Sequence, residues 1–464
     1  MNETALRELL EGTARLAAQY RDSLEARAVR SLLSPDELSR ALAVPLTARG
    51  ESAAQVIEAL ARAGAVGSVA SAGPRYFGFV IGGSTPAALA ADWLVSAWDQ
   101  NGGLYATSPL IAAIEEVTAA WLRELAGLPG SMTVGFVTGC QMASFTALAA
   151  ARHRVLRNAG WDVEAEGLFA APPIEVLVSE EAHYTIFMAL RLLGLGGSRL
   201  RRVPADAQGR MRADALGALL RSGSGPCIVC AQAGNVNSGG FDPLEEIAAL
   251  TRERGAWLHV DAAFGLWAAA APSRAGLVRG IERADSIATD GHKWLNVPYD
   301  CGIVFCADET AHRSAMSLAS PALSAPYLAT SNRQRDPHEF VPEESRRGRA
   351  VPVYAALRTL GRAGLAELIE RNCRQAQRFA AGLAASGCEV LNEVVLNQVV
   401  VAFGDAERTR RVVAAVQEDG TCWCGATVWK GRTAMRISVS SWATTDADVE
   451  RSLAAILRVA RSTA

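Results

Sequence analysis

Two short apolar segments, each followed by a side chain that can do chemistry, constrain this chain most. The first, residues 255–265, resembles a buried strand that ends in Asp261 before a run of small residues. The second, residues 286–288, precedes Lys293, which lies 32 positions after Asp261 (293 − 261). That interval is long enough for one helix and one short strand, so both strands can end at the same edge of a sheet, where α/β proteins bind ligands. The pattern predicts an α/β fold with a site at that edge.

The lysine at this edge is unusual for the chain. Of 46 Lys and Arg residues only two are Lys, at positions 293 and 430, so 44 are Arg (46 − 2). Arginine cannot replace lysine where the nitrogen has to lose its proton and attack a carbonyl carbon. The low number of lysines alone is equally compatible with a lysine that has remained at position 293 by chance. The neighbouring strands and the acid favour a nucleophilic amine at Lys293.

An amine and a carboxylate at one sheet edge are the pair that pyridoxal phosphate requires. The lysine forms an imine with the cofactor aldehyde, and the acid keeps the pyridine nitrogen protonated. The protonated ring then accepts the electron pair that is left when a bond to the substrate Cα breaks. We therefore predict Lys293 and Asp261 as the catalytic pair and pyridoxal 5'-phosphate as the cofactor.

The two motifs around this pair resemble those of a known family. They are His259-Val-Asp-Ala-Ala263 and Asp290-Gly-His-Lys-Trp294. They are similar to the cofactor motifs of the group II pyridoxal-phosphate-dependent decarboxylases, which include the aromatic L-amino acid, histidine and glutamate decarboxylases. The likeness runs from about Pro74 to the C-terminal helix. It implies the aspartate aminotransferase fold (fold type I), with a mostly parallel seven-stranded sheet flanked by helices in a large domain.

The resemblance and the helix signals together predict three parts. Residues 1–72 carry helical periodicity and a Ser34-Pro35 helix start, but too little apolar surface for a domain of their own. We predict them as a helical arm that wraps the partner subunit of a homodimer with active sites at the subunit interface. Residues 73–340 are predicted as the large cofactor-binding domain, and residues 341–464 as a smaller C-terminal α/β domain.

A strand, a glycine turn and a helix follow one another in residues 132–152. Free N–H groups and the dipole at a helix N-terminus hold phosphate groups, which assigns Gly139, Cys140 and Gln141 to the cofactor phosphate. The family carries Ser or Thr hydroxyl donors at this turn, and this chain does not. We therefore expect backbone N–H groups to bind the phosphate, with the Gln141 amide as an additional donor.

The resemblance implies further cofactor contacts. His183 follows a strand and corresponds to the family histidine that lies flat over the cofactor ring and meets the substrate carboxylate. Asn235 is expected to reach the ring oxygen, and His292 the phosphate. Asp290 stands where other members have a neutral polar residue, and a carboxylate there would repel a phosphate dianion. We expect its side chain to turn away and either cap a backbone group or pair with an arginine.

The substrate side is predicted from aromatic and charged residues. The resemblance assigns residues 73–80 to the substrate pocket, with Tyr76 and Phe79 as candidate contacts and core packing as the alternative for each ring. Arg347 belongs to a basic cluster that also contains Arg346 and Arg349. That cluster either faces the phosphate or the substrate carboxylate, or forms a solvated helix end.

A mobile loop is predicted at the end of the large domain. Residues 324–344 are irregular and charged, which is typical of such loops. In the family a loop here closes over the substrate and brings a Tyr that protonates the carbanion. Pro337 stands at that position in this chain, and Tyr327 lies about ten residues earlier. We take His338 as the replacement candidate for the proton donor and as a substrate contact.

The composition argues against several other classes. A net charge of −2 argues against nucleic acid or an anionic membrane as the main partner, and no run of about 20 apolar residues occurs. The first ten residues mix charges into an amphipathic helix, unlike a signal peptide. Nine cysteines, an odd number, indicate reduced thiols and a cytoplasmic protein. We expect no metal site, because neither Cys227-Ile-Val-Cys230 nor Cys422-Trp-Cys424 has a second ligand pair.

These observations predict a pyridoxal-phosphate-dependent carboxy-lyase that converts an L-amino acid into an amine and CO2. The pocket aromatics lean toward an aromatic substrate. The missing loop tyrosine leaves open an aldehyde synthase, in which oxygen reacts with the carbanion. The Asp-x-His-Lys pattern leaves open a carbon–carbon lyase similar to the sphingosine-phosphate lyases. A catalytically degenerate binding subunit is the alternative from another class.

Overall fold

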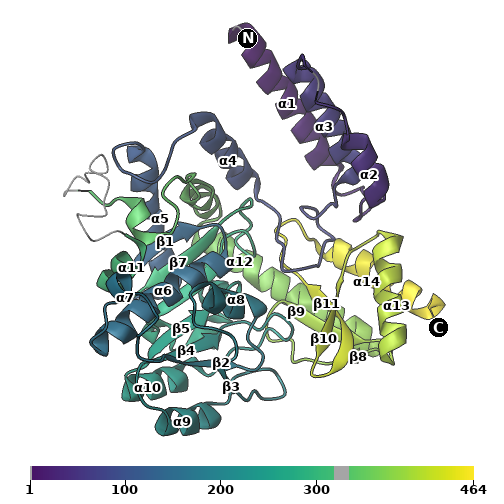
Figure 1. The fold of residues 1–464 in the computed structure, drawn as a ribbon. Helices are drawn as coiled ribbons and strands as arrows, with labels where there is room; N and C mark the ends of the chain where they lie inside the picture. The colour runs from purple at the N-terminus through teal and green to yellow at the C-terminus, as the bar shows by residue number, and fades with distance from the viewer. Residues whose placement is uncertain (1–2, 47, 318–333, 464) are drawn as a thin grey trace.

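The fold has three parts, which Figure 1 shows as an arm, a central sheet with its helices, and a C-terminal lobe. The computed structural model describes residues 3–46, 48–317 and 334–463. Within these residues no helix is both long enough and apolar enough to span a bilayer. The three parts follow the predicted order along the chain, and the predicted boundaries at 72/73 and 340/341 stay predictions.

The N-terminal arm consists of three helices, α1 (Glu3–Ser23), α2 (Pro35–Leu42) and α3 (Ala53–Gly67). Ser34 caps α2 as predicted, in a capping box with Glu37 and with Pro35 as the first helical residue. Neither α2 nor α3 contains a buried residue in the single chain. The arm projects away from the rest of the molecule (Figure 1). Leu10 of α1 and Val56 and Leu60 of α3 stay more than 40% exposed in the subunit.

The central sheet confirms the predicted fold class. Within the described residues its strands run in the order β1-β7-β6-β5-β4-β2-β3. Only β7 is antiparallel to its neighbours, so the sheet is mostly parallel. In chain order the strands are β1 (Thr133–Val137), β2 (Glu175–Ser179), β3 (Arg201–Val203), β4 (Cys227–Gln232), β5 (Trp257–Asp261), β6 (Ser286–Asp290) and β7 (Gly302–Cys306).

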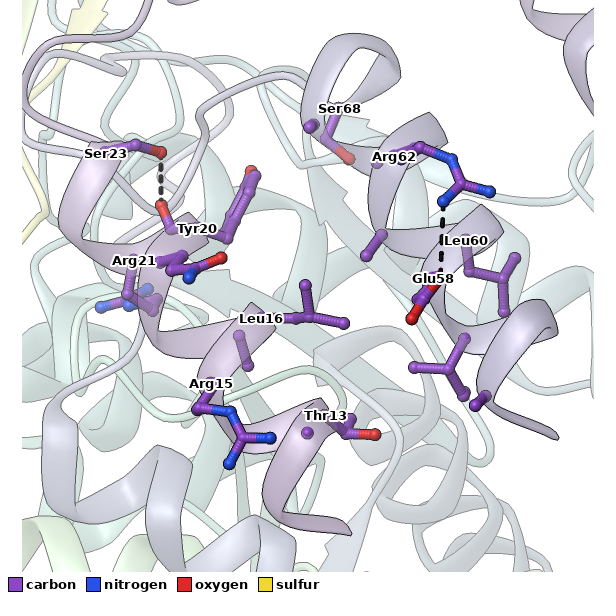
Figure 2. Close-up of a pocket in the computed structure, with 18 of the residues that line it drawn as sticks. Thr13, Arg15, Leu16, Tyr20, Arg21, Ser23, Glu58, Leu60, Arg62 and Ser68 are labelled. Carbon is purple, nitrogen blue, oxygen red and sulfur yellow. Dashed lines mark hydrogen bonds and ion pairs between the residues drawn. The ribbon is translucent and has the colours of Figure 1, made fainter. Parts of the chain in front are cut away.

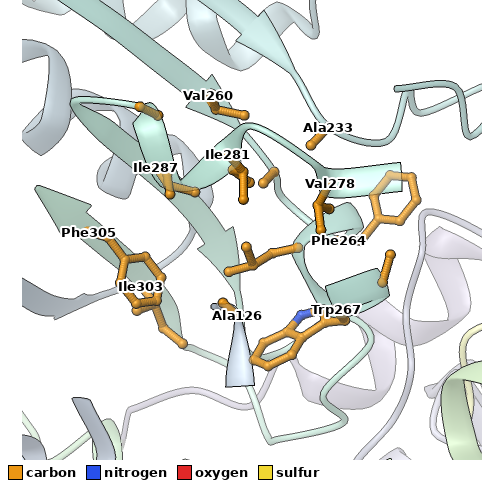
Figure 3. Packing of buried hydrophobic residues seen from close by; sticks show 14 of the residues in the cluster. Ala126, Ala233, Val260, Phe264, Trp267, Val278, Ile281, Ile287, Ile303 and Phe305 are labelled. Carbon is orange, nitrogen blue, oxygen red and sulfur yellow. The ribbon is translucent and has the colours of Figure 1, made fainter. Parts of the chain in front are cut away.

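Helices cover both faces of this sheet, and the central strands are buried along their whole length. Strands buried on both faces have near-continuous apolar sequences, as these do. Val260, Ile287 and Trp267 belong to one cluster of buried side chains (Figure 3). The elements around the sheet are α4 (Pro86–Trp98), α5 (Pro109–Leu125), α6 (Cys140–Asn158), α7 (Val163–Glu166), α8 (Tyr184–Leu192), α9 (Ala213–Ser222), α10 (Leu244–Arg254), η1 (Gly265–Ala270), η2 (Ala275–Val278), η3 (Ile281–Arg283), α11 (Glu309–Met316) and η5 (Pro337–Phe340).

The helix that carries the predicted phosphate site is tied to the sheet by a buried histidine. His259 lies on β5 with no exposed surface. Its Nδ1 lies 3.0 Å from the Ser286 hydroxyl on β6, and its Nε2 lies 3.3 Å from the Ser144 hydroxyl on α6. These contacts join two strands and one helix. The N-terminus of α6 is thereby held at the carboxyl edge of the sheet.

The C-terminal lobe has its own antiparallel sheet, in the order β10-β11-β9-β8. A 36-residue helix, α12 (Ala350–Ala385), leads into it and changes direction at Gly361, whose φ is 60°. The two parts of α12 are helices that meet at this kink, because the backbone of Gly361 is not helical. The first half of α12 packs on α4 and α5, and the second half packs on the lobe. The other elements are β8 (Glu389–Val390), β9 (Gln398–Ala402), α13 (Ala406–Asp419), β10 (Gly425–Trp429), β11 (Arg432–Ser438) and α14 (Asp446–Ser462).

Candidate active site

The structure brings Lys293 and Asp261 into one cluster at the carboxyl edge of the sheet. β5 and β6 are parallel neighbours, with Asp261 aligned to Ala288. Lys293 follows β6, and its Nζ lies 3.0 Å from Asp290 Oδ2. Cys140 joins the two sides, because its N–H donates to Asp290 Oδ1 at 2.6 Å and its thiol to Asp261 Oδ1 at 3.4 Å. Three segments that are distant in the sequence therefore meet at the predicted pair.

Asp261 keeps one oxygen free for a further donor. Its Oδ1 accepts hydrogen bonds from the Ala263 N–H at 3.1 Å and from the Cys140 thiol. Its Oδ2 accepts none from the described residues, although only 3% of the residue is exposed. A carboxylate oxygen that accepts no hydrogen bond from the described residues fits the protonated nitrogen of a pyridine ring.

The turn before α6 fits an anion. The amides of Gln141 and Met142, in the first helical turn, donate to no acceptor among the described residues, as expected of orphan helix-start donors. Gly139 is packed so closely that an added Cβ would meet His292 Cε1 at 3.2 Å. A Cβ on Gly302 would overlap the Gly139 backbone. The free donors and the absence of side chains beside them fit a phosphate group, and the assignment to the cofactor stays a prediction.

Asp290 behaves only partly as predicted. Its side chain does cap a backbone group, the N–H of Cys140. The expected alternative, an arginine partner, is wrong for the described residues, because the cation that Asp290 contacts at 3.0 Å is Lys293. His292 also approaches it, with Nε2 at 3.4 Å from Oδ1. The carboxylate thus lies inside the predicted phosphate site, with 2% of the residue exposed.

The charges of this cluster keep Lys293 protonated. Burial lowers the pKa of the Lys293 amine, but the nearby negative charges, that of Asp290 first, outweigh burial and raise the pKa above its ordinary value. Burial lowers the pKa of His183, against the opposing effect of Asp261. His183 is therefore a neutral imidazole at pH 7. Its Nδ1 lies 2.7 Å from the Thr185 hydroxyl, and its Nε2 has no hydrogen-bond partner among the described residues.

His292 is held in place by the loop that follows Lys293. Its Nδ1 accepts the Cys301 N–H at 3.1 Å, which leaves Nε2 directed at the Asp290 carboxylate. Its ring lies 4.3 Å from the ring of Tyr299, measured between centroids. The imidazole is therefore positioned at the phosphate end of the cluster, in agreement with the motif, and its contact with the phosphate stays a prediction.

The side chain of Asn235 forms hydrogen bonds with residues of its own turn and with Glu181. Its Nδ2 donates to Glu181 O at 3.3 Å and to Gln232 Oε1 at 3.2 Å. Its Oδ1 accepts the N–H groups of Asn237 and Ser238. All the hydrogen-bonding capacity that a cofactor contact would need is therefore engaged, so the predicted contact with the ring oxygen gains no support from the structure.

The three aromatic rings of residues 76–79 have different surroundings. Tyr76 stacks on Trp423 with centroids 5.0 Å apart and an angle of 12°. Phe79 lies 5.4 Å from the same indole and is 59% exposed. Phe77 is fully buried against Phe379, so core packing is the correct interpretation for that ring. Phe79 also has a φ of 52°, a costly conformation for a non-glycine residue that is often found at functional sites.

Two tentative substrate residues have partners elsewhere. Arg347 is exposed and donates to Asp92 Oδ1 on α4 at 2.6 Å, so it contacts neither a phosphate donor nor Lys293. His338 Nδ1 lies 3.3 Å from Glu344 Oε2, and the backbone N–H of His338 donates to Gly103 O. Neither residue shares a hydrogen bond with the cluster among the described residues, and both roles stay predictions. Tyr327 lies outside the described residues.

The structure adds two residues that the motifs did not indicate. Arg436 on β11 is half-buried, and its charge contributes to lowering the pKa of His183. An arginine between the buried residues Met435 and Ile437 was a visible signal in the sequence. Tyr299 packs on His292. The pKa of Tyr76 is raised to about 12, first by burial and second by the charge of Tyr299. No local pattern marks Tyr299.

Comparison with known proteins agrees with this geometry. Residues 35–403 match the pyridoxal-dependent decarboxylase conserved domain. The chain belongs to this decarboxylase family. It is 30% identical over 344 residues to an aromatic-L-amino-acid decarboxylase of Bacillus atrophaeus, which covers 72% of this chain and 68% of that protein. It is 33% identical over 391 residues to an L-2,4-diaminobutyrate decarboxylase of Rhizobium meliloti (strain 1021), which covers 81% and 75%.

The fold is also that of solved decarboxylase-family structures. The crystal structure of Oryza sativa TDC with PLP and tryptamine superimposes with a TM-score of 0.92 at 23% identity, over 100% of this chain and 99% of that one. This decarboxylase is therefore a carboxy-lyase that uses pyridoxal phosphate, and the free Asp261 oxygen, the free α6 amides and Lys293 fit that cofactor. Its relatives act on amino acids of different chemistry.

Proposed function

We propose that this decarboxylase converts an L-amino acid, preferably an aromatic one, into the amine and CO2. The observation that carries the proposal is the meeting of Lys293, Asp261 and the start of α6 at one sheet edge. The family membership supports the reaction class. The preference for an aromatic side chain rests on the rings beside the cluster.

The residues of the chain have separate tasks in this reaction. Bound pyridoxal phosphate supplies an aldehyde and a protonated ring that takes up the electron pair of the broken bond. Lys293 would hold the aldehyde end of the cofactor through its amine. Asp261 Oδ2 would face the ring nitrogen and keep it protonated, because it accepts no hydrogen bond from the described residues. The neutral His183 ring has a free Nε2 among the described residues and would orient the bound ring.

The substrate carboxylate has a cation within reach. Arg436 donates from Nη1 to Val236 O at 3.3 Å, and its charge acts on His183. A substrate carboxylate near these two residues would accept a hydrogen bond from His183 and would be attracted by the charge of Arg436.

An aromatic substrate side chain fits the wall formed by Tyr76, Trp423 and Phe79. The first two rings are stacked, and the third presents an exposed face. Aromatic contacts of this kind favour an aromatic ligand by about 0.5–1.5 kcal/mol beyond area burial. The decisive test is a panel of amino acids assayed for CO2 release and for the amine, in which a linear cationic or acidic substrate as the best one would refute the aromatic preference.

The first variant to make is Lys293→Ala. We expect it to lose the visible absorbance of the bound cofactor and all release of CO2, because alanine carries no amine. The matched control is Lys430→Ala, since Lys430 is the other lysine of the chain and pairs with Glu181 at 3.1 Å on the surface. Retention of both signals in Lys293→Ala would contradict the proposed role.

A second product is favoured by one observation, the proline at position 337. No tyrosine stands at the predicted proton-donor position, and the candidate His338 is held by Glu344 and Gly103. A carbanion that is protonated slowly is open to oxygen, which leads to an aldehyde. Product analysis with and without oxygen separates the two outcomes. A carbon–carbon lyase or a degenerate subunit has no comparable support, since the family match is to decarboxylases.

We also propose that the decarboxylase is a homodimer of the reducing cytoplasm. All nine cysteines are free thiols, and eight of them are buried. Free thiols are typical of proteins in a reducing compartment.

The dimer is supported by the surface of the arm. A groove of about 1200 Å³ lies between α1 and α3 and reaches Trp93 of α4. Figure 2 shows Leu16 of α1 and Leu60 of α3 beside it. The arm exposes Leu10, Val56 and Leu60, each by more than 40%. A partner subunit's arm would cover such an apolar surface.

A further inference from the structure

One carboxylate holds groups that the cofactor needs. Asp290 Oδ1 accepts the N–H of Cys140, the first amide of α6, at 2.6 Å. Its Oδ2 lies 3.0 Å from the Lys293 amine, which must bond the aldehyde. His292 Nε2, the other predicted phosphate donor, lies 3.4 Å from Oδ1. The carboxylate therefore contacts both the phosphate end and the aldehyde end of the site.

Asp290 does not use all the N–H donors at the start of α6. The amides of Gln141 and Met142 have no acceptor among the described residues. A carboxylate has two oxygens and one charge, whereas a phosphate has three terminal oxygens and up to two charges. Asp290 satisfies one of the α6 donors and leaves the others free. It is thus an incomplete substitute for the group that the turn is shaped to hold.

Asp290 and a phosphate cannot occupy this turn together. Two anions within a few ångströms repel each other strongly where water is excluded, and only 2% of Asp290 is exposed. The N–H of Cys140 is also a single donor that both anions require. Cofactor capture must therefore either move the Asp290 side chain or neutralise it.

We propose that Asp290 is an internal competitor of the cofactor phosphate, which occupies the start of α6 and the Lys293 amine until the cofactor displaces it. The competitor keeps the buried lysine charged and the helix start satisfied in the protein without cofactor. It also weakens the binding of any ligand that carries a phosphate. This inference concerns cofactor capture alone, so it does not depend on the proposed substrate or product.

The test uses two ligands that cannot form a bond with Lys293. Pyridoxine 5'-phosphate carries the phosphate but no aldehyde, and pyridoxine lacks both. We expect Asp290→Asn to bind pyridoxine 5'-phosphate at least tenfold more tightly than the unaltered protein, and pyridoxine within about twofold. Equilibrium titration of the cofactor-free protein, followed by fluorescence or calorimetry, measures both dissociation constants.

Two further variants guard the conclusion. Asp290→Ala removes the carboxylate without adding a donor and should show the same gain if Asn alters the fold. Asp285→Asn changes a carboxylate at the opposite end of β6, which accepts the Leu258 N–H at 2.7 Å, and should leave both constants unchanged. An unchanged or weaker affinity of both Asp290 variants for pyridoxine 5'-phosphate would overturn the proposal. Since no turnover is measured, this result is independent of the decarboxylation assay.

Discussion

At the residue scale, burial sets the charge of the histidines. His259 has no exposed surface, and burial lowers its pKa to about 4. His312 is also fully buried, between Thr133 and the Phe340 carbonyl, and burial lowers its pKa to about 3. Both rings use their two nitrogens in hydrogen bonds within the core. Their neutral forms are therefore part of the folded structure.

Protonation of these rings is expected to destabilise the fold in acid. A histidine whose pKa is lower in the folded state stabilises the fold above about pH 6.5, and this contribution is lost as the pH falls. The change from 6.5 to about 4 at His259 corresponds to roughly 3 kcal/mol. Urea unfolding between pH 7.5 and 4 measures the free energy of unfolding. His259→Asn should lower stability at pH 7.5 and flatten its pH dependence, and an unchanged slope would contradict this account.

At the element scale, the contact between β7 and the start of α6 positions the phosphate donors. Gly302, the first residue of β7, faces the backbone of Gly139 with no room for a side chain. Gly139 is in turn packed against His292. The glycines are required here by close approach, because Gly139 has an extended backbone that any residue can adopt. The strand therefore fixes where the α6 amides point.

Gly302→Ala is expected to weaken cofactor binding. The new methyl group overlaps the Gly139 backbone and pushes the α6 start away from its position. Overpacking of this kind costs about 1–3 kcal/mol, which corresponds to roughly a tenfold or greater rise in the dissociation constant of the cofactor. Absorbance titration with pyridoxal phosphate measures it. Gly276→Ala is the control, since its Cβ would have open space, and equal affinities of the two variants would refute the positioning role.

At the scale of the whole molecule, the arm is the part that the subunit does not bury. α2 and α3 have no buried residue, and Leu60 of α3 is 55% exposed beside the groove of Figure 2. Phe79, a predicted substrate contact, is also exposed. Both features are explained if a second subunit covers the arm and completes the pocket.

Leu60→Asp is expected to convert the proposed dimer into monomers. A buried, unpaired carboxylate at an apolar interface costs several kcal/mol, which exceeds the margin of most dimers at micromolar concentration. Light scattering after size exclusion reports the mass of the particle. Val428→Asp changes an exposed apolar residue of the C-terminal lobe and should leave the mass unchanged. A monomeric unaltered protein would contradict the dimer itself.

The sequence by itself determined the central strands, the cap of α2 and the position of Asp261 and Lys293 at one edge of the sheet. Buried parallel strands require continuous apolar runs, and Ser34 with Pro35 starts a helix through contacts within one turn. Asp261 and Lys293 follow such strands, so their position at one sheet edge could be predicted from local patterns.

Only the tertiary structure decided which partners these side chains have. Asp290 pairs with Lys293 rather than an arginine, the amide of Asn235 is engaged by its own turn, and Arg347 pairs with Asp92. Arg436, on β11 of the C-terminal lobe, contacts Val236 O of the large domain, and its charge lowers the pKa of His183. Each of these contacts joins groups whose distance depends on how helices and strands pack, and a polar side chain takes the nearest partner that packing supplies. The distance between such groups cannot be predicted from local sequence patterns.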